Sequence, residues 1–363
     1  YWYNFMLFTL LVFGIVLSIL VFVHEFGHFL VAKKIGVRVE EFGFGLPPKL
    51  WGFKHGETVY SLNWLPIGGF VRLSGEDEAE QVKAKLAPIE LQRYFFARSK
   101  KERAAILLAG VTMNFLLAVA IFSVVFTYGL EIPGGVKVAE VVVNSPAQIA
   151  GLEKDDFIVS IDGTQLEDVG RISTKIKEKL GKTVTVTVLR EGKKLDISVI
   201  PRVDPPPGEG AIGIKMEQIV KELKYPWYQA PFYGVYWGVV FSWEMATLLF
   251  DLFWRLVTFR SVPTDQIAGP IGIAQTVGAA ARYGFLEVAK ITGLLSLNLA
   301  LVNVLPIPAL DGGRLLFVVI EKFIGKRVKP KVEQIAHQVG MTFLLALIAL
   351  ITLNDILRNF RSK

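Results

Sequence analysis

The chain has 363 residues, 52% of them hydrophobic and 20% charged, and a formal net charge of +7 at pH 7. It contains no cysteine, which excludes a disulfide framework, a thiolate metal site and a cysteine nucleophile. Its basic residues cluster beside long apolar runs, as in membrane proteins whose cytoplasmic loops are positively charged. No nucleic-acid recognition motif accompanies them, so we expect no nucleic-acid partner.

Four apolar segments predict a polytopic α-helical membrane protein with about four transmembrane helices, since a spanning helix needs about 20 mostly apolar residues. The first covers residues 1–34, and the others are expected at 104–130, 286–320 and 334–357. The first segment lacks a basic start and ends in ionisable residues. We therefore expect it to be retained and not removed as a signal peptide.

The segments between the predicted spans differ in character. Residues 35–103 carry glycine and proline between short apolar runs, which predicts membrane-associated β-hairpins followed by a charged helix. Residues 134–203 contain four runs of alternating polar and apolar residues around one helical stretch, typical of a soluble α+β domain. Residues 204–285 contain a proline-rich linker and an aromatic-rich segment. We expect this segment to form an amphipathic helix in the membrane interface, with a further span as the alternative.

The distribution of basic residues predicts the orientation in the membrane. Lysine and arginine are dense in residues 33–103 and in the short basic loop 321–333. Loops of this kind remain in the cytoplasm. Residues 134–203 and both termini then lie outside, although three basic residues in the last six positions run against the rule.

A motif with metal-ligand spacing, His24-Glu25-Phe26-Gly27-His28, lies near the end of the first apolar segment. Residues four apart lie on one face of a helix, so both imidazoles can face one metal ion, with Glu25 as a candidate general base. The structural alternative is a pair of hydrogen-bonded core histidines. Ionisable groups inside an apolar span are costly and mark functional sites by default, which favours a metal site.

A catalytic zinc needs a third protein ligand, and Asp311 is the best candidate. It lies in the segment 303–313, Asn-Val-Leu-Pro-Ile-Pro-Ala-Leu-Asp-Gly-Gly, where two prolines interrupt the third apolar run. A broken helix is tolerated in a membrane where it lines protein or a wet cavity, so we expect Asp311 to face such a cavity. The two remaining histidines, His55 and His337, are expected to be ordinary polar residues.

These two motifs together resemble the site-2 protease family of intramembrane zinc metalloproteases, in its bacterial RseP-like branch. The resemblance covers nearly the whole chain. It implies that His24, His28 and Asp311 are the zinc ligands, with Glu25 as the general base. It also implies that Asn303 contacts the substrate backbone near the scissile bond.

The soluble segment and the second span extend the resemblance with departures. Within residues 134–203, the stretches 145–152 and 156–163 are similar to a PDZ domain, which implies one inserted PDZ domain outside the cytoplasm. The branch often carries two such domains. The second span reads Gly-Val-Thr-Met-Asn at 110–114, where the family usually has proline after the glycine.

The function implied by the resemblance is hydrolysis of peptide bonds within or near the transmembrane segments of single-pass membrane proteins, such as anti-sigma factors or signal-peptide remnants. The enzyme would need Zn²⁺ and would lie in the lipid bilayer of a bacterial cytoplasmic (inner) membrane. A helical substrate must unwind to expose its carbonyls, and an edge strand from residues 36–75 could hold it extended by strand addition.

Two other functions are open. One is a catalytically silent membrane scaffold that binds peptides through its PDZ domain, and the other is a metal transporter or sensor. The intact Glu25 argues against a scaffold, which has no need of a general base. A transporter would need further intramembrane ligands, which the sequence does not offer.

The PDZ domain also allows two roles. A PDZ fold normally binds peptide C-termini through backbone amides in a loop before a strand. That loop is expected near residues 131–135, whose sequence shows no convincing carboxylate-binding pattern. We therefore favour a lid over the outer mouth of the active site, with capture of peptide C-termini as the alternative.

Overall fold

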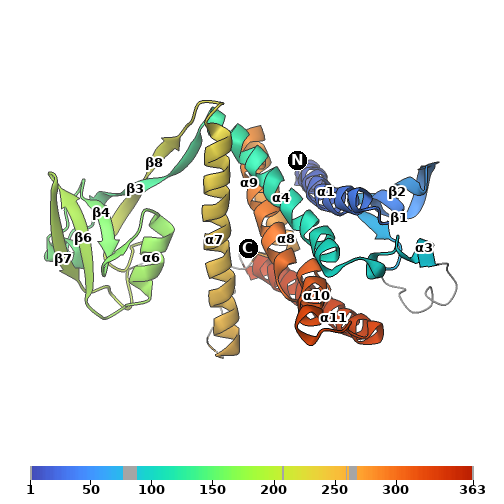
Figure 1. Cartoon of the computed structure of the whole chain (residues 1–363). Coiled ribbons are helices and arrows are strands. Elements are labelled where there is room, and N and C mark those ends of the chain that lie inside the picture. Colours follow the sequence, from blue (N-terminus) through green and yellow to red (C-terminus); the bar gives the residue numbers. More distant parts are fainter. Residues whose placement is uncertain (1, 77–87, 207, 259, 261–267, 362–363) are drawn as a thin grey trace. The chain divides into compact units, whose positions relative to one another are not determined.

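The protein is described by a computed structural model, shown in Figure 1, which covers residues 2–76, 88–206, 208–258, 260 and 268–361. The chain divides into two compact units. The first unit contains Tyr1–Thr127 and Pro226–Lys363, and the second contains Tyr128–Tyr225. Each unit is a separate fold and is described in turn.

The first unit is mainly helical. Its long helices are α1 (Trp2–Ile35), α4 (Lys100–Tyr128), α7 (Ala230–Val257), α8 (Pro270–Tyr283), α9 (Phe285–Val304), α10 (Asp311–Ile324) and α11 (Pro330–Arg361). Four segments of the described chain are long and apolar enough to cross a membrane: Met6–Ile35, Lys100–Tyr128, Phe285–Val304 and Lys331–Leu357. This number agrees with the four spans predicted from the sequence. Helix α7 is not among them, and it carries Glu244 and Asp251.

The third predicted segment, residues 286–320, contains the helix break that was expected at its two prolines. Helix α9 ends at Val304, and a separate helix, α10, begins at Asp311. Proline lacks a backbone donor and disfavours helical geometry at the residue before it, so Pro306 and Pro308 separate the two helices. Asp311 is thereby the first residue of α10.

The second span begins earlier than predicted. Part of the charged helix expected before it, residues 77–87, lies outside the described residues. The rest of that segment contains a short helix α3 (Pro88–Leu91) and a 3₁₀ turn η1 (Phe95–Ala97) before α4 starts at Lys100. The Ser99 amide donates to a Glu102 carboxylate oxygen at 2.9 Å, and the Glu102 amide donates to the Ser99 hydroxyl at 3.3 Å. This reciprocal capping box stabilises the helix start at that point.

The segment after α1 forms one hairpin that folds back on itself. Strands β1 (Val39–His55) and β2 (Thr58–Leu73) are antiparallel, and residues 41–44 of β1 pair with two parts of β2, at 59–62 and at 69–72. Its aromatic side chains pack on α1, where the ring of Phe42 lies 5.3 Å from that of Phe22 and 4.7 Å from that of Phe29, centre to centre.

The second unit is a six-stranded sheet with two helices. The strands are β3 (Leu130–Val141), β4 (Phe157–Ile161), β5 (Thr164–Gln165), β6 (Val184–Arg190), β7 (Lys193–Val199) and β8 (Ile214–Leu223), and the helices are α5 (Pro146–Ala150) and α6 (Val169–Lys177). The strand order is β7-β6-β4-β3-β8, with β5 on β4. Helix α6 lies against this sheet (Figure 1), and buried valine and isoleucine side chains fill the core between them.

Two boundaries predicted for this unit differ from the structure. The unit extends past the predicted range 134–203, because β8 pairs with β3 along its length in a segment expected to be linker. The sequence of β8 alternates poorly, and its side chains are mostly exposed or half-buried, so its pattern gave little sign of a strand. Residues 131–135, expected as a carboxylate-binding loop, lie within β3 and pair with residues 219–222 of β8.

In the second unit, a buried carboxylate is paired with a partly exposed arginine, and this pair is expected to contribute to stability. The Asp156 side chain is buried and accepts hydrogen bonds from Arg190 Nε at 2.7 Å, Arg190 Nη2 at 2.8 Å and the Glu153 amide at 2.9 Å. Burial raises the pKa of Asp156, but these donors lower it by more than burial raises it, so the net shift of the pKa is downward. The stabilisation is therefore present above the ordinary carboxyl pKa and is lost as the pH falls.

We expect Asp156→Asn to destabilise this unit by about 1.5–3 kcal/mol, because a charged acceptor of several hydrogen bonds is removed. Thermal unfolding or limited proteolysis of the purified protein measures the change. Asp155→Asn is the matched control, because Asp155 forms an exposed ion pair with Lys137 and such pairs contribute little. Equal stability of the two variants would contradict the prediction.

Candidate metal centre

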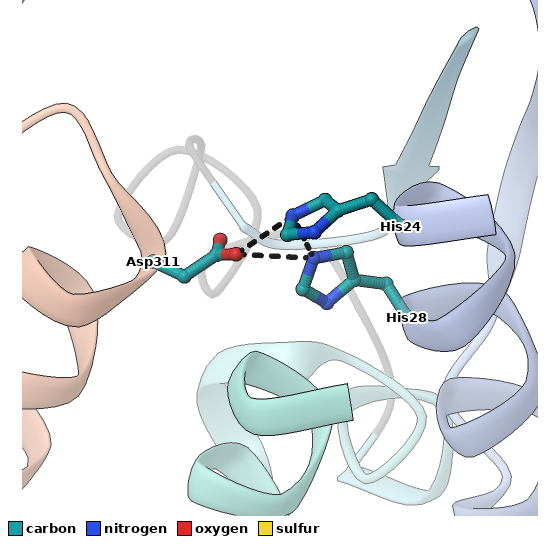
Figure 2. Close-up of side chains that lie close together, drawn as sticks. All are labelled: His24, His28 and Asp311. Carbon is teal, nitrogen blue, oxygen red and sulfur yellow. Dashed lines mark hydrogen bonds and ion pairs between the residues drawn. The ribbon is translucent and has the colours of Figure 1, made fainter. Parts of the chain in front are cut away.

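Three potential metal ligands converge in the first unit. His24 and His28 lie on one face of α1, both are buried, and their Nε2 atoms lie 3.2 Å apart. Asp311, the first residue of α10, places Oδ2 3.0 Å from His24 Nε2 and 3.3 Å from His28 Nε2, as Figure 2 shows. The structure thus brings together the residues that the sequence singled out from positions almost 290 residues apart.

This arrangement fits a zinc ion. Two imidazole nitrogens and one carboxylate oxygen form a donor set typical of catalytic zinc, which keeps one position open. Donors about 2.0–2.2 Å from a tetrahedral zinc are separated by roughly 3.3–3.6 Å, close to the spacing of these three atoms. Among the described residues, His24, His28 and Asp311 form a group whose ligand atoms all lie within 4.8 Å of one another.

The loop before α10 fixes the position of Asp311. Ala309 has a φ of 88°, an unusual conformation for a residue with a side chain, and its amide donates to His337 Nδ1 at 3.2 Å. A Cβ at Gly313 would lie 2.8 and 2.9 Å from backbone atoms of this loop, so glycine is needed where α10 packs against it. His337 therefore holds the loop by accepting a hydrogen bond.

Glu25 and Asn303 line a cavity together with two of the three potential ligands, His24 and Asp311. One cavity is lined by Val21, His24, Glu25, Leu299, Asn303, Ala309, Leu310 and Asp311. A second cavity also contains Glu25 and Asp311, together with His28, Phe70 and Val71 of β2. The Val71 amide donates to Glu25 Oε2 at 3.1 Å, which connects the hairpin to the carboxylate. Both residues predicted to be catalytic therefore lie at the site.

The charges around Asp311 keep it ionised. Burial raises the pKa of its carboxyl group, but hydrogen bonds and charges from His24 and His28 lower it well below its ordinary range. Arg314, one turn further along α10, forms an ion pair with Glu76 and lines the second cavity. Burial lowers the pKa of Arg314, a residue for which no role was predicted.

Two further residues with possible ligand atoms, His55 and Asp251, lie apart from this centre. His55 is exposed at the end of β1, and Asp251 forms an exposed ion pair with Arg255 within α7. One buried polar residue near the centre was given no role by the sequence analysis: Asn114 of α4, whose side-chain amide lies 3.3 Å from His24 Nδ1. A polar side chain in an otherwise apolar span was the available signal.

The comparison with known proteins decides the family. The model of peptidase family M50 matches residues 12–347. The chain belongs to peptidase family M50. This confirms the resemblance to the site-2 proteases that the two motifs indicated.

Several curated relatives cover nearly the whole chain. A Rhizobium meliloti relative is 35% identical over 364 residues, with 96% of each chain aligned. The zinc metalloprotease RasP of Shouchella clausii is 30% identical and that of Oceanobacillus iheyensis 28%, each over 97% of this chain and 99% of the relative. A PDZ domain of an SdrC-like protein from Listeria monocytogenes matches 23% of this chain and 86% of its own length, at 26% identity and a TM-score of 0.21.

The ligand set predicts how the metal content responds to substitution. Asp311→Ala removes one of three donors while leaving both imidazoles, so we expect the zinc bound per chain to fall sharply, as measured by elemental analysis of purified protein. His55→Ala is the control and should keep the wild-type zinc content. Unchanged zinc in Asp311→Ala would show that the third ligand is another residue.

Proposed function

We propose that this chain hydrolyses peptide bonds within or near the membrane-spanning segments of other proteins, with His24, His28 and Asp311 as the ligands of its zinc ion. The family and the names of its relatives make it a zinc metalloprotease, and the proposal concerns the residues and the place of cleavage. One observation carries it: two of the three candidate ligands, His24 and His28, lie on α1 within the apolar segment Met6–Ile35.

Each residue at the site has a proposed part in the reaction. Zinc, when bound, supplies a Lewis acid that polarises a carbonyl and makes water a stronger nucleophile. The Glu25 carboxylate accepts a proton from the attacking water and gives it to the nitrogen of the leaving amine. The Asn303 side chain, on the same cavity, hydrogen-bonds to the substrate backbone near the scissile bond.

The substrate must be extended to be cut, since a helix hides its carbonyls. Phe70 and Val71 lie in the part of β2 that faces the cavity with Glu25 and His28. We assign to residues 69–73 the role of an edge to which a substrate strand adds, because main-chain hydrogen bonds would hold it beside Glu25. A catalytically silent scaffold would not need a carboxylate such as Glu25 beside the metal ligands.

The cellular setting follows from the same proposal. The partners are single-pass membrane proteins and the lipid bilayer, and the membrane is the bacterial cytoplasmic (inner) membrane. The basic loop between α10 and α11 faces the cytoplasm, and residues 128–225 form a PDZ-like unit outside it. For that unit, capture of peptide C-termini is the alternative to the lid role that the sequence favours.

Glu25→Gln tests the proton-transfer role. The amide is nearly isosteric but cannot accept a proton, so zinc content should stay at the wild-type level while cleavage falls about 100- to 10,000-fold. Turnover of a single-pass model substrate in liposomes measures this effect. Glu244→Gln, an exposed residue of α7, is the control and should retain activity. Near wild-type cleavage by Glu25→Gln would eliminate Glu25 as the general base.

The topology is tested with single cysteines in the cysteine-free chain. Thr164 and Lys326 are both exposed and belong to the PDZ-like unit and the basic loop, respectively. A membrane-impermeant thiol reagent added to intact cells should label Thr164→Cys and should reach Lys326→Cys only after permeabilisation. Labelling of both variants in intact cells would contradict the four-span orientation.

A further inference from the structure

Three residues on one face of α4, each one turn after the last, lie beside the candidate metal centre. Ile106, Gly110 and Asn114 are spaced four residues apart, so they lie in a row on the helix. The Ile106 carbonyl lies 2.8 Å from His28 Nδ1, and the Asn114 side-chain amide lies 3.3 Å from His24 Nδ1. Each imidazole thus faces the other ligands with Nε2 and faces α4 with Nδ1.

Gly110 allows this close approach. A Cβ at this position would lie 2.7 Å from His24 Cε1, and it would also collide with His28. Any larger residue would push α4 away from α1 or displace both imidazoles. The glycine between Ile106 and Asn114 therefore brings the two acceptor groups of α4 within reach of the two histidines.

The chemistry of the imidazole decides what Asn114 must do. A neutral histidine that offers Nε2 to a metal carries its proton on Nδ1, which then needs an acceptor. For His28 that acceptor is the Ile106 carbonyl. For His24 the group in reach is the Asn114 amide, whose Oδ1 is buried and has no hydrogen-bond partner among the described residues. Turning this amide places Oδ1 against Nδ1–H and gives up only the present Nδ2 contact.

The backbone of Asn114 is held independently of its side chain. Asn114 is fully buried, and its carbonyl accepts a hydrogen bond from the Ser296 hydroxyl of α9 at 2.7 Å. Helix α9 leads directly into the loop before Asp311. The amide of Asn114 is therefore in a fixed position relative to His24 and needs only to rotate.

We propose that Asn114 is a positioning residue that fixes the tautomer and the ring orientation of His24 and thereby raises the affinity of the site for zinc. The inference rests on the proposed metal ligands and adds a residue that acts through one of them. Hydrogen-bond partners of metal-bound histidines typically contribute 10- to 100-fold to metal affinity.

Zinc affinity of the full-length purified protein, measured by competition with a chromophoric chelator, tests this role. We expect Asn114→Leu to weaken zinc binding 10- to 100-fold, because Nδ1–H loses its acceptor. Asn114→Asp keeps an acceptor and should bind zinc at least as tightly as wild type. Asn298→Leu makes the same chemical change on an exposed part of α9 and should have no effect.

A spectroscopic measurement separates positioning from folding. With cobalt(II) in place of zinc, the visible ligand-field spectrum should change in Asn114→Leu and be restored in Asn114→Asp. Asn114→Ala replaces the leucine variant if that protein does not fold. Equal losses in the aspartate and leucine variants, or no loss in either, would overturn the proposal. Failure of the wild-type protein to bind either metal would instead refute the proposed ligand set.

Discussion

Two imidazoles on the mostly apolar helix α1 meet the carboxylate of Asp311, which comes from α10. The arrangement of the first unit depends on this contact. Buried polar groups without partners cost several kcal/mol, about 2–7 in apolar surroundings. Here the partners come from other helices: the Ile106 carbonyl from α4 for His28, and the Asp311 carboxylate from α10 for both imidazoles. Helices α1, α4 and α10 must therefore converge at one point before any chemistry is possible.

Helices α4 and α10 are also joined near the far end of α10. Arg103 of α4 and Glu321 of α10 form a buried ion pair, and the Lys100 ammonium donates to the Glu321 carbonyl at 2.8 Å. Breaking a buried pair leaves an uncompensated charge, which is more costly than never having buried it. Glu321 is ten residues from Asp311, about 15 Å along the helix. The contact of Asp311 with α1 and that of Glu321 with α4 thus hold α10 near both of its ends, and with it the carboxylate.

The sequence could predict the ligands because their spacing carries the chemistry. Two histidines four residues apart and an aspartate beside two prolines can be recognised from sequence alone, as can four long apolar runs. The pairing of β8 with β3 could not, because it depends on a partner about 80 residues away and on a weakly alternating strand. The Asn114 contact was hidden for a related reason: a motif shows that a residue is polar in an apolar helix, but not which imidazole it reaches.

The helix break before Asp311 shows why a continuous span would not serve. In a continuous helix the backbone amides are used within the helix, and the aspartate would sit on its side like any other residue. As the first residue of α10, Asp311 lies where the helix dipole favours a negative charge. The two flanking histidines lower its pKa further against the effect of burial. The prolines therefore do more than interrupt a helix: they place an anionic ligand at the start of α10, opposite the two histidines.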